Sequence, residues 1–309
     1  MMRIIFLIAC SIGIQYNIFS QSFAISDDVK RIVFLGNSIT YQGKYIAFID
    51  AYFSIHYPDK HYEIINAGLP SETVSGLSEP GHAKGKYPRP DLHDRLHRVV
   101  AETKPDLVLA CYGMNDGIYL PFSEKRFKKY KKGIYRLHKA IEKSGAEIIH
   151  ITPPVYDGRK GEAYANVLDI YSDWLISNRY TKGWNVIDIH WPMKKKLEDH
   201  RRIDSTFVFA KDGIHPNDTG HFEMAKQILE FFVGPPFSTT DDINGFLSAH
   251  QNAAEIFNLV QLRQRITKDA WLTHIGHKRP NMKKGLPMDE AQAKSKEIEA
   301  KIQLLIQKE

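Results

Sequence analysis

Hydrophobic and polar positions along the chain follow two alternating patterns. In one of them, short runs are almost continuously apolar and are followed by Gly, Pro, Asn or Asp, which is typical of buried β-strands that end in turns. Five such runs are present, at residues 31–35, 62–66, 107–111, 147–152 and 185–188. We therefore expect five strands.

The segments between these runs repeat their apolar residues with helical spacing. Leu92, Leu96, Val99 and Val100 fall at i, i+4, i+7 and i+8 and so share one face of a helix. Strands that alternate with helices predict an α/β domain with a five-stranded parallel sheet and helices on both faces. Ligands of such sheets bind outside the carboxyl ends of the strands, where we expect the functional residues.

The first 24 residues have the pattern of a secretory signal peptide. Arg3 precedes an apolar run that is too short to span a membrane, and a small-residue ending follows at Ala24, so cleavage is expected there. We therefore expect a secreted or periplasmic protein. The alternative is a lipid anchor on Cys10, because residues 7–10 resemble a lipid-attachment box.

A helical extension over residues 240–309 is predicted to follow the main domain, residues 25–239. Its two helices are expected over 243–266 and 289–306, around a Gly- and Pro-rich connection. The second helix carries an apolar stripe that must be buried against something: Ile298, Ile302 and Leu305.

This stripe has one expected partner, the rest of the same chain. A second subunit is an alternative, which would make the protein an oligomer. A further alternative is that the extension delivers basic residues of its connection to a substrate cleft. Those residues are His277, Lys278 and Arg279.

Charge and cysteine content narrow the possible functions. The 309 residues carry a formal net charge of +6, with acidic residues interspersed among the basic ones, which indicates solubility or an anionic surface nearby and no nucleic-acid-binding face. Of the two cysteines, Cys10 would leave with the signal peptide. Cys111 would then remain alone, which excludes an intramolecular disulfide.

The first strand leads into Gly36-Asn37-Ser38, and Ser38 has two interpretations. In one, Ser38 caps the next helix. In the other, it is a nucleophile at a strand-to-helix corner, where free N–H groups of the helix N-terminus face a developing oxyanion. The string alone leaves both interpretations open.

Three later segments also carry residue types that suit catalysis. Gly68 follows the second strand and either forms a turn or presents an unhindered backbone N–H. Asn115 follows the third strand and either belongs to an Asn-Asp-Gly turn or offers its side-chain N–H₂ group. Asp212 precedes His215 by three residues, so its carboxylate can bond one ring nitrogen and leave the other free as a base.

In order and placement, these segments resemble the blocks of the SGNH/GDSL hydrolase superfamily: an N-terminal Gly-Asp-Ser, a glycine after the second strand, a Gly-x-Asn-Asp and an Asp-x-x-His. The counterparts in this chain are Gly36-Asn37-Ser38, Gly68, Gly113-Met114-Asn115-Asp116 and Asp212-Gly213-Ile214-His215. The resemblance covers residues 31–233 and implies a three-layer, flavodoxin-like fold. Asn37 departs from the pattern, because the family more often has Asp there and an amide carries no charge.

The resemblance also implies a serine esterase that works through an acyl-enzyme. Ser38 would be the nucleophile, His215 the base and Asp212 the residue that orients the base. The backbone N–H groups of Ser38 and Gly68 and the side-chain amide of Asn115 would form the oxyanion hole.

No metal and no cofactor is implied. His93 and His97 are spaced i, i+4 on the polar side of a predicted helix, but their string lacks the glutamate that a metalloprotease has at its second position. We interpret both histidines as solvated.

Secretion, the modest positive charge and loop aromatic residues favour an acylated glycan or a related small molecule as the substrate. Those aromatic residues are Tyr41, Tyr45, Tyr112, Tyr119 and Trp191. Because secreted superfamily members are often carbohydrate esterases, the leading hypothesis is removal of O-acetyl groups from a carbohydrate. A lysophospholipase or thioesterase of the same fold is one alternative, and a non-catalytic glycan-binding protein is another.

Overall fold

The computed structural model describes residues 23–234 and 242–307. The expected signal sequence up to residue 22, including Cys10, lies outside these residues, so its assignment stays a prediction. Within the described ranges, none of the helices has the length and apolar character that a membrane span requires.

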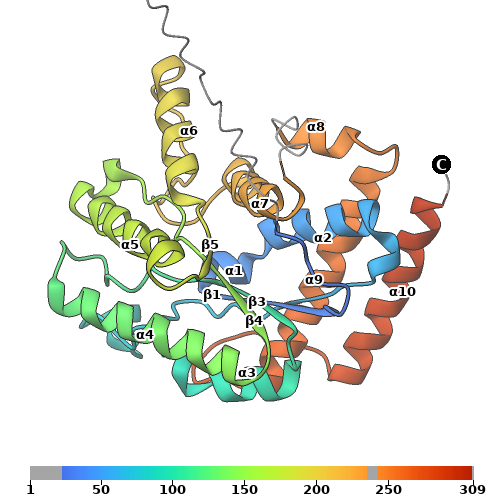
Figure 1. Cartoon of the computed structure of the whole chain (residues 1–309), viewed down its shortest axis with the longest axis horizontal. Helices are drawn as coiled ribbons and strands as arrows, with labels where there is room; N and C mark the ends of the chain where they lie inside the picture. Colours follow the sequence, from blue (N-terminus) through green and yellow to red (C-terminus); the bar gives the residue numbers. More distant parts are fainter. Residues whose placement is uncertain (1–22, 235–241, 308–309) are drawn as a thin grey trace, which may run out of the picture.

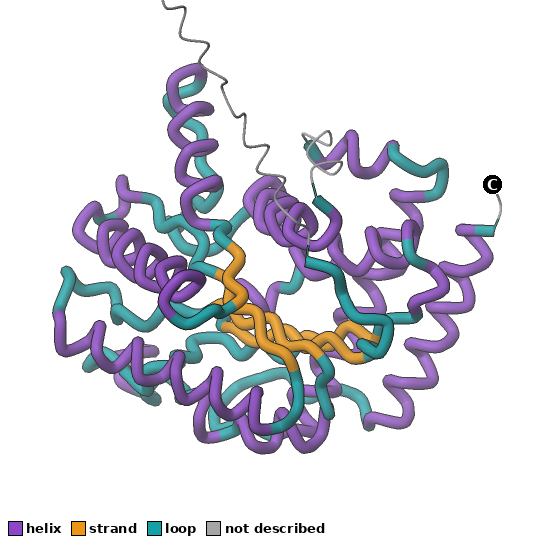
Figure 2. The backbone as a smooth tube through the Cα atoms, in the orientation of Figure 1, coloured by secondary structure: helices purple, strands orange, loops and turns teal. Residues whose placement is uncertain are grey.

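Five parallel strands form a single sheet at the centre of the molecule (Figure 2). They run in the order β2-β1-β3-β4-β5, which confirms the prediction of a five-stranded parallel sheet. Their bounds are Arg31–Gly36 (β1), Glu63–Asn66 (β2), Leu107–Cys111 (β3), Glu147–Ile151 (β4) and Asn185–Ile187 (β5). Gly36 is paired in register with Cys111, so the ends of β1 and β3 lie side by side.

Helices cover both faces of the sheet, with α3 and α4 below it and α2 and α7 above it in Figure 1. The helices of the main domain are Ser38–Gln42 (α1), Lys44–His56 (α2), Leu96–Thr103 (α3), Glu124–Lys143 (α4), Glu162–Thr181 (α5), His190–Ile203 (α6) and Asp218–Val233 (α7). This arrangement confirms the three-layer fold.

The core lies where these layers meet. All five residues of β3 are buried, which explains why the strand is apolar without alternation, since a parallel sheet covered on both faces has no solvent side. Val33, Leu35 and Leu109 are completely buried, and each such side chain contributes roughly 1.5–3 kcal/mol of transfer free energy.

The C-terminal extension packs onto the main domain along α2 and β2 (Figure 1). It consists of Ile243–Ser248 (α8), Ala253–Ile275 (α9) and Met288–Ile306 (α10). Ile298 and Ile302 of the predicted stripe are buried in the same hydrophobic core as the sheet. The expectation that the stripe packs on its own chain is therefore confirmed.

The first helix of the extension differs from its prediction. The predicted span 243–266 is interrupted after Ser248, and α9 then continues to Ile275. The interruption is stabilised by a tertiary contact, because the Asn252 side chain donates to the carbonyl of Leu305 in α10 at 2.8 Å. The helix ends only at Gly276, whose φ of 75° is in the left-handed region that favours glycine.

Candidate active site

Ser38 lies at the corner where β1 passes into α1. The corner is tight, because a Cβ atom on Gly36 would lie 2.1 Å from Thr40 Oγ1. Asn37 caps the helix, and its side-chain oxygen accepts the N–H of Ile39 at 3.1 Å. The cap is thus Asn37 and not Ser38, which leaves the Ser38 hydroxyl available and its N–H among the helix's free donors.

His215 and Asp212 meet the Ser38 hydroxyl in a continuous line of hydrogen bonds. Ser38 Oγ lies 2.8 Å from His215 Nε2, and His215 Nδ1 lies 2.6 Å from Asp212 Oδ2. Ser38 and His215 are separated by 177 positions along the chain. The structure therefore brings all three predicted residues together at the carboxyl edge of the sheet.

Asp212 is held in place by its own loop. Its Oδ1 accepts the backbone N–H groups of Ile214 at 2.9 Å and His215 at 2.8 Å. Partial burial acts to raise the pKa of Asp212, but the hydrogen bonds from the His215 ring and from these N–H groups outweigh it and lower the pKa. Asp212 is therefore a fixed carboxylate beside the imidazole at neutral pH.

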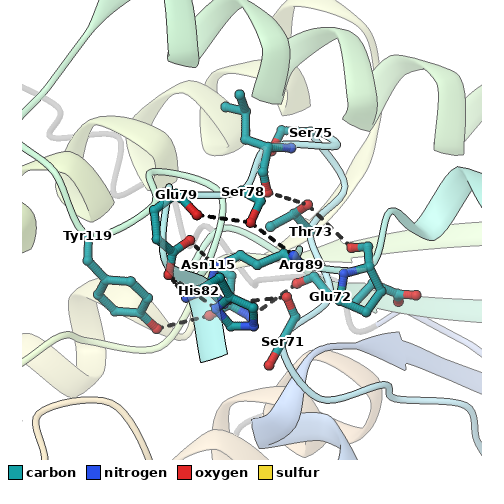
Figure 3. A network of polar contacts seen from close by, with 12 residues as sticks. Ser71, Glu72, Thr73, Ser75, Ser78, Glu79, His82, Arg89, Asn115 and Tyr119 are labelled. Carbon is teal, nitrogen blue, oxygen red and sulfur yellow. Dashed lines mark hydrogen bonds and ion pairs between the residues drawn. The ribbon is translucent and has the colours of Figure 1, made fainter. Parts of the chain in front are cut away.

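Asn115 is fixed at the end of β3 by two hydrogen bonds. Its Nδ2 donates to the carbonyl of Glu72 at 3.1 Å, and its Oδ1 accepts from the Tyr119 hydroxyl at 2.9 Å. Figure 3 shows Tyr119 reaching Asn115 from one side and the loop of Glu72 on the other. Since the amide nitrogen has two hydrogens, one N–H remains for a ligand.

The turn that carries Asn115 is clamped and strained. Asp116 Oδ1 accepts the N–H groups of Val74 at 2.9 Å and Ser75 at 2.8 Å, while burial raises the pKa of this carboxyl to about 6. Ile118 and Tyr119 have φ values of 49° and 56°, where a β-branched residue such as isoleucine is rarely found. Strain of this kind persists only where the surroundings enforce it, and it is concentrated at functional sites.

Gly68 lies against α1, as its predicted role requires. A Cβ atom there would lie 2.5 Å from the backbone nitrogen of Tyr41, so only glycine fits. Its N–H, however, donates to the side chain of Asn66 at 3.0 Å. An oxyanion would therefore share this donor with Asn66 or displace it.

Several supporting residues were missed by the sequence analysis. Asn66 links β2 to α1, because its Nδ2 donates to the carbonyl of Thr40 at 2.7 Å. Beneath Asn115, Glu72 forms a fully buried ion pair with Arg95 at 2.6 Å and accepts the Tyr112 hydroxyl at 2.7 Å. A buried Glu-Arg pair has no local sequence pattern, although the Asn at the end of the second strand was a usable signal.

Two of the loop aromatic residues named above are not in a position to bind a sugar. Tyr45 lies within α2 and Tyr112 follows β3 directly, and both are almost completely buried. The interpretation of His93 as solvated was also wrong, since its ring is partly buried, its Nε2 has no solvent access and burial lowers its pKa. The two tyrosines and His93 were assigned to the surface from their local sequence. They are wholly or partly buried because other parts of the chain pack over them.

His221 lies in α7 beside the site. Its Nε2 is 3.1 Å from Gln42 Oε1 at the end of α1. Burial and the neighbouring Lys44 lower the pKa of His221 to about 4. The ring is therefore neutral, and its Nε2–H donates to Gln42.

We expect this buried histidine to make the fold sensitive to acid. Between pH 6.5 and 4 the unfolded chain binds a proton on His221 that the folded chain does not, so stability is lost as pH falls through that window, by up to about 3 kcal/mol. Urea unfolding of the wild type and of His221→Gln at pH 7 and pH 4.5 measures this loss. The free energy of unfolding of the variant should fall less between the two pH values than that of the wild type. His61→Gln, which removes an exposed histidine, should behave as wild type, and equal losses in all three proteins would contradict the assignment.

Across residues 23–234 and 242–307, no cluster of three or more His, Cys, Asp or Glu side chains could hold a metal ion. Cys111 is a buried free thiol whose pKa is raised to about 12 by burial.

Solved structures with the same fold include several variants of one esterase, Axe2. A catalytic mutant of Axe2, an acetylxylan esterase from Geobacillus stearothermophilus, aligns with a TM-score of 0.54 and 20% identity over 68% of this chain and 97% of its own. LAE5, an α/β hydrolase from the metagenome of Lake Arreo in Spain, aligns with a TM-score of 0.53 and 22% identity over 69% and 97%. At this identity the similarity shows the fold.

A gut microbial diltiazem-metabolizing enzyme also aligns, with a TM-score of 0.53 and 20% identity. The match covers 69% of this chain and 49% of that enzyme, so it spans only about half of the enzyme's length. No curated protein sequence matches the chain. The model of the GDSL-like lipase/acylhydrolase family matches residues 34–221, a span that holds Ser38, the Asn115 turn and His215, and the chain therefore belongs to this family of SGNH hydrolases.

Proposed function

We propose that the protein is a serine esterase that removes O-acetyl groups from a carbohydrate. The observation that carries the proposal is the line of hydrogen bonds from Ser38 Oγ through His215 to Asp212. A nucleophile, a base and an orienting carboxylate within hydrogen-bond reach are the components that acyl transfer requires.

Each step of the reaction assigns a proton to a named atom. His215 Nε2 takes the proton of Ser38 Oγ as the oxygen attacks the ester carbonyl carbon. The tetrahedral intermediate then expels the sugar alcohol, which takes the proton from Nε2. Water then attacks the acyl carbon and gives a proton to the same nitrogen. The second tetrahedral intermediate releases acetate as Ser38 Oγ takes that proton back from Nε2. Asp212 stabilises the charged imidazole in both halves.

The oxyanion is proposed to be met by three donors: the N–H of Ser38, the N–H of Gly68 and the free side-chain N–H of Asn115. The Ser38 N–H belongs to a helix N-terminus, where the helix dipole also favours negative charge. Asn115 is held rigidly by Glu72 and Tyr119. Donors fixed in advance cost no reorganisation when the charge develops, and this supports catalysis over a role as turn residues.

An acetylated glycan is supported as the substrate by the site's surroundings. Tyr41 of α1 provides a ring and a hydroxyl, which donates to Asp269, and Arg89 lies over the ring of Tyr119 in the Asn115 turn. Hydroxyl-rich ligands require such groups, whereas a lipid chain requires an apolar groove. Axe2, which shares the fold, is described as an acetylxylan esterase.

Acyl-chain preference tests this proposal against its alternatives. We expect the purified protein to hydrolyse acetyl esters, including an acetylated oligosaccharide, with kcat/KM at least about tenfold above that for octanoyl or longer esters. Activity should be the same in buffer that contains a chelator. A preference for long acyl chains or thioesters would favour the lysophospholipase or thioesterase alternative. Glycan binding without hydrolysis of any ester would favour the non-catalytic alternative.

A further inference from the structure

A cavity of about 290 Å³ lies beside the helix that begins at Ser38. It is bounded by Gln42 and Lys44 on the main domain and by Gln261, Arg265 and Lys268 of α9. Gln42 is four residues beyond Ser38, which corresponds to about 6 Å along a helix axis. The cavity is therefore within reach of a substrate whose ester is bound at Ser38.

The wall of this cavity is cationic. Lys44, Arg265 and Lys268 contribute positive charge, the remaining polar side chains of the lining are amides, and no lining residue is Asp or Glu. Lys44 pairs with Asp218 and Lys268 with Asp269, but both carboxylates belong to residues outside the lining. The cavity thus presents hydrogen-bond donors and positive charge to whatever enters it.

Lys268 shows that the positive charge there is only partly neutralised. Its side chain is 12% exposed, and its Nζ lies 3.5 Å from the centroid of the Tyr41 ring. Burial lowers its pKa, Asp269 opposes that effect, and the neighbouring Lys283 and Arg265 lower the pKa further. A bound anion would relieve this repulsion.

The cavity wall is also connected to the proposed catalytic residues. Gln42 accepts from His221, whose ring lies near both His215 and Lys44. On the other side, Tyr41 donates its hydroxyl to Asp269 of α9 at 3.0 Å. The C-terminal extension therefore completes a surface that begins at the nucleophile.

A second, larger cavity differs from this one in the charges of its wall. It has a volume of about 510 Å³ and lies between β2, α9 and α10. Two of the cations in its wall are paired within that wall, Arg31 with Glu63 at 2.9 Å and Arg263 with Asp50 at 2.7 Å. Its wall also holds three carboxylates, those of Asp50, Glu63 and Glu299, which would repel an anion, whereas the wall of the smaller cavity holds none.

We propose that the cavity between α1, α2 and α9 is a subsite for an anionic group, a carboxylate or a sulfate, carried by the glycan whose ester Ser38 attacks. This inference rests on the proposed esterase function and narrows it to acidic acetylated glycans. Amides and cations around a cavity of this size suit a charged sugar unit that also has hydroxyl groups. Arg265 is an exposed residue at its edge, and it can be changed without disturbing the core.

Hydrolysis of two matched substrates tests the subsite. We expect Arg265→Gln to lower kcat/KM for an O-acetylated oligogalacturonide by about tenfold more than for an O-acetylated xylooligosaccharide, as for loss of one charge-assisted hydrogen bond. The wild-type preference for the acidic substrate should decline as salt rises. Arg202→Gln removes an exposed arginine of α6 and should keep the wild-type ratio. Equal losses on both substrates, or a ratio independent of salt, would overturn the proposal.

Binding to the Ser38→Ala protein separates this inference from the proposed function. Calorimetry would compare an ester-free oligogalacturonide, a sulfated oligosaccharide and a neutral xylooligosaccharide. Binding of the first two that is weakened by Arg265→Gln supports the subsite even if the wild type hydrolyses no ester, and the tighter of them identifies the anionic group. If esters are hydrolysed but neither hydrolysis nor binding depends on Arg265, the subsite is wrong and the esterase assignment stands.

Discussion

Replacement of Ser38 by alanine is expected to lower kcat for acetyl ester hydrolysis by about 10⁶-fold, the loss seen when the nucleophile of a comparable triad is removed. The reason is that without Oγ no acyl-enzyme forms, and the His215 base has no nucleophile to activate. His215→Ala should cost about as much, because the two groups act as a unit. Steady-state kinetics on a short acetyl ester, with the melting temperature of each variant, provides the measurement.

Covalent labelling gives an independent check on the same residue. A serine-directed phosphonate should modify the wild type at Ser38 and should leave Ser38→Ala unlabelled. Ser26→Ala, a change outside the site, serves as the control and should label normally. Labelling at another residue, or a Ser38→Ala protein that keeps near-full activity, would mean that the nucleophile has been misassigned.

Loss of the Asn115 amide is expected to have the second largest effect. We expect Asn115→Ala to lower kcat by about 10²- to 10³-fold, or 2.7–4 kcal/mol, with little change in KM, as for removal of one oxyanion donor. KM stays nearly constant because the ground-state carbonyl does not reach the donor as the oxyanion does. The measurement is kcat and KM on a short-chain ester, together with the melting temperature.

Tyr119→Phe is the matched control for this variant. It removes the hydroxyl that donates to Asn115 Oδ1 but keeps the Asn115 amide itself, so it tests positioning without loss of the donor. We expect a smaller loss of kcat than with Asn115→Ala. If Asn115→Ala lowers the melting temperature and leaves kcat unchanged, Asn115 is a turn residue and has no part in the oxyanion hole.

The strands could be predicted to within a residue or two because of how a doubly covered parallel sheet is buried. Every residue of β3 is inside, so the run 107–111 is apolar throughout and is bounded by residues that end strands. The ends of the helices were harder to predict. The interruption before α9 depends on a hydrogen bond between Asn252 and Leu305, and contacts 53 positions apart leave no local pattern.

The candidate site shows the same difference between local and distant contacts: residues in short local strings could be predicted, and residues joined by distant contacts could not. Ser38, Asp212 and His215 could be identified because each lies in a short string with its own spacing and follows a strand or precedes a helix. The residues that hold the site in place could not be identified from the sequence. Glu72 contacts Arg95, 23 positions away, and Tyr41 contacts Asp269, 228 positions away. The cationic cavity could not be predicted from the sequence for the same reason, because one wall comes from the N-terminal part of the chain and the other from α9.

The cover that α9 gives to β2 has a consequence for synthesis and folding. β2 is an outer strand of the sheet, and the side chain of Gln264 donates to the carbonyl of Ile64 at 3.1 Å, in the place where another strand would otherwise pair. An uncovered edge of this kind recruits strands from other molecules. Because the chain is made from its N-terminus, the sheet is complete well before residue 264 leaves the ribosome. We expect nascent or truncated chains that lack α9 to aggregate through this edge.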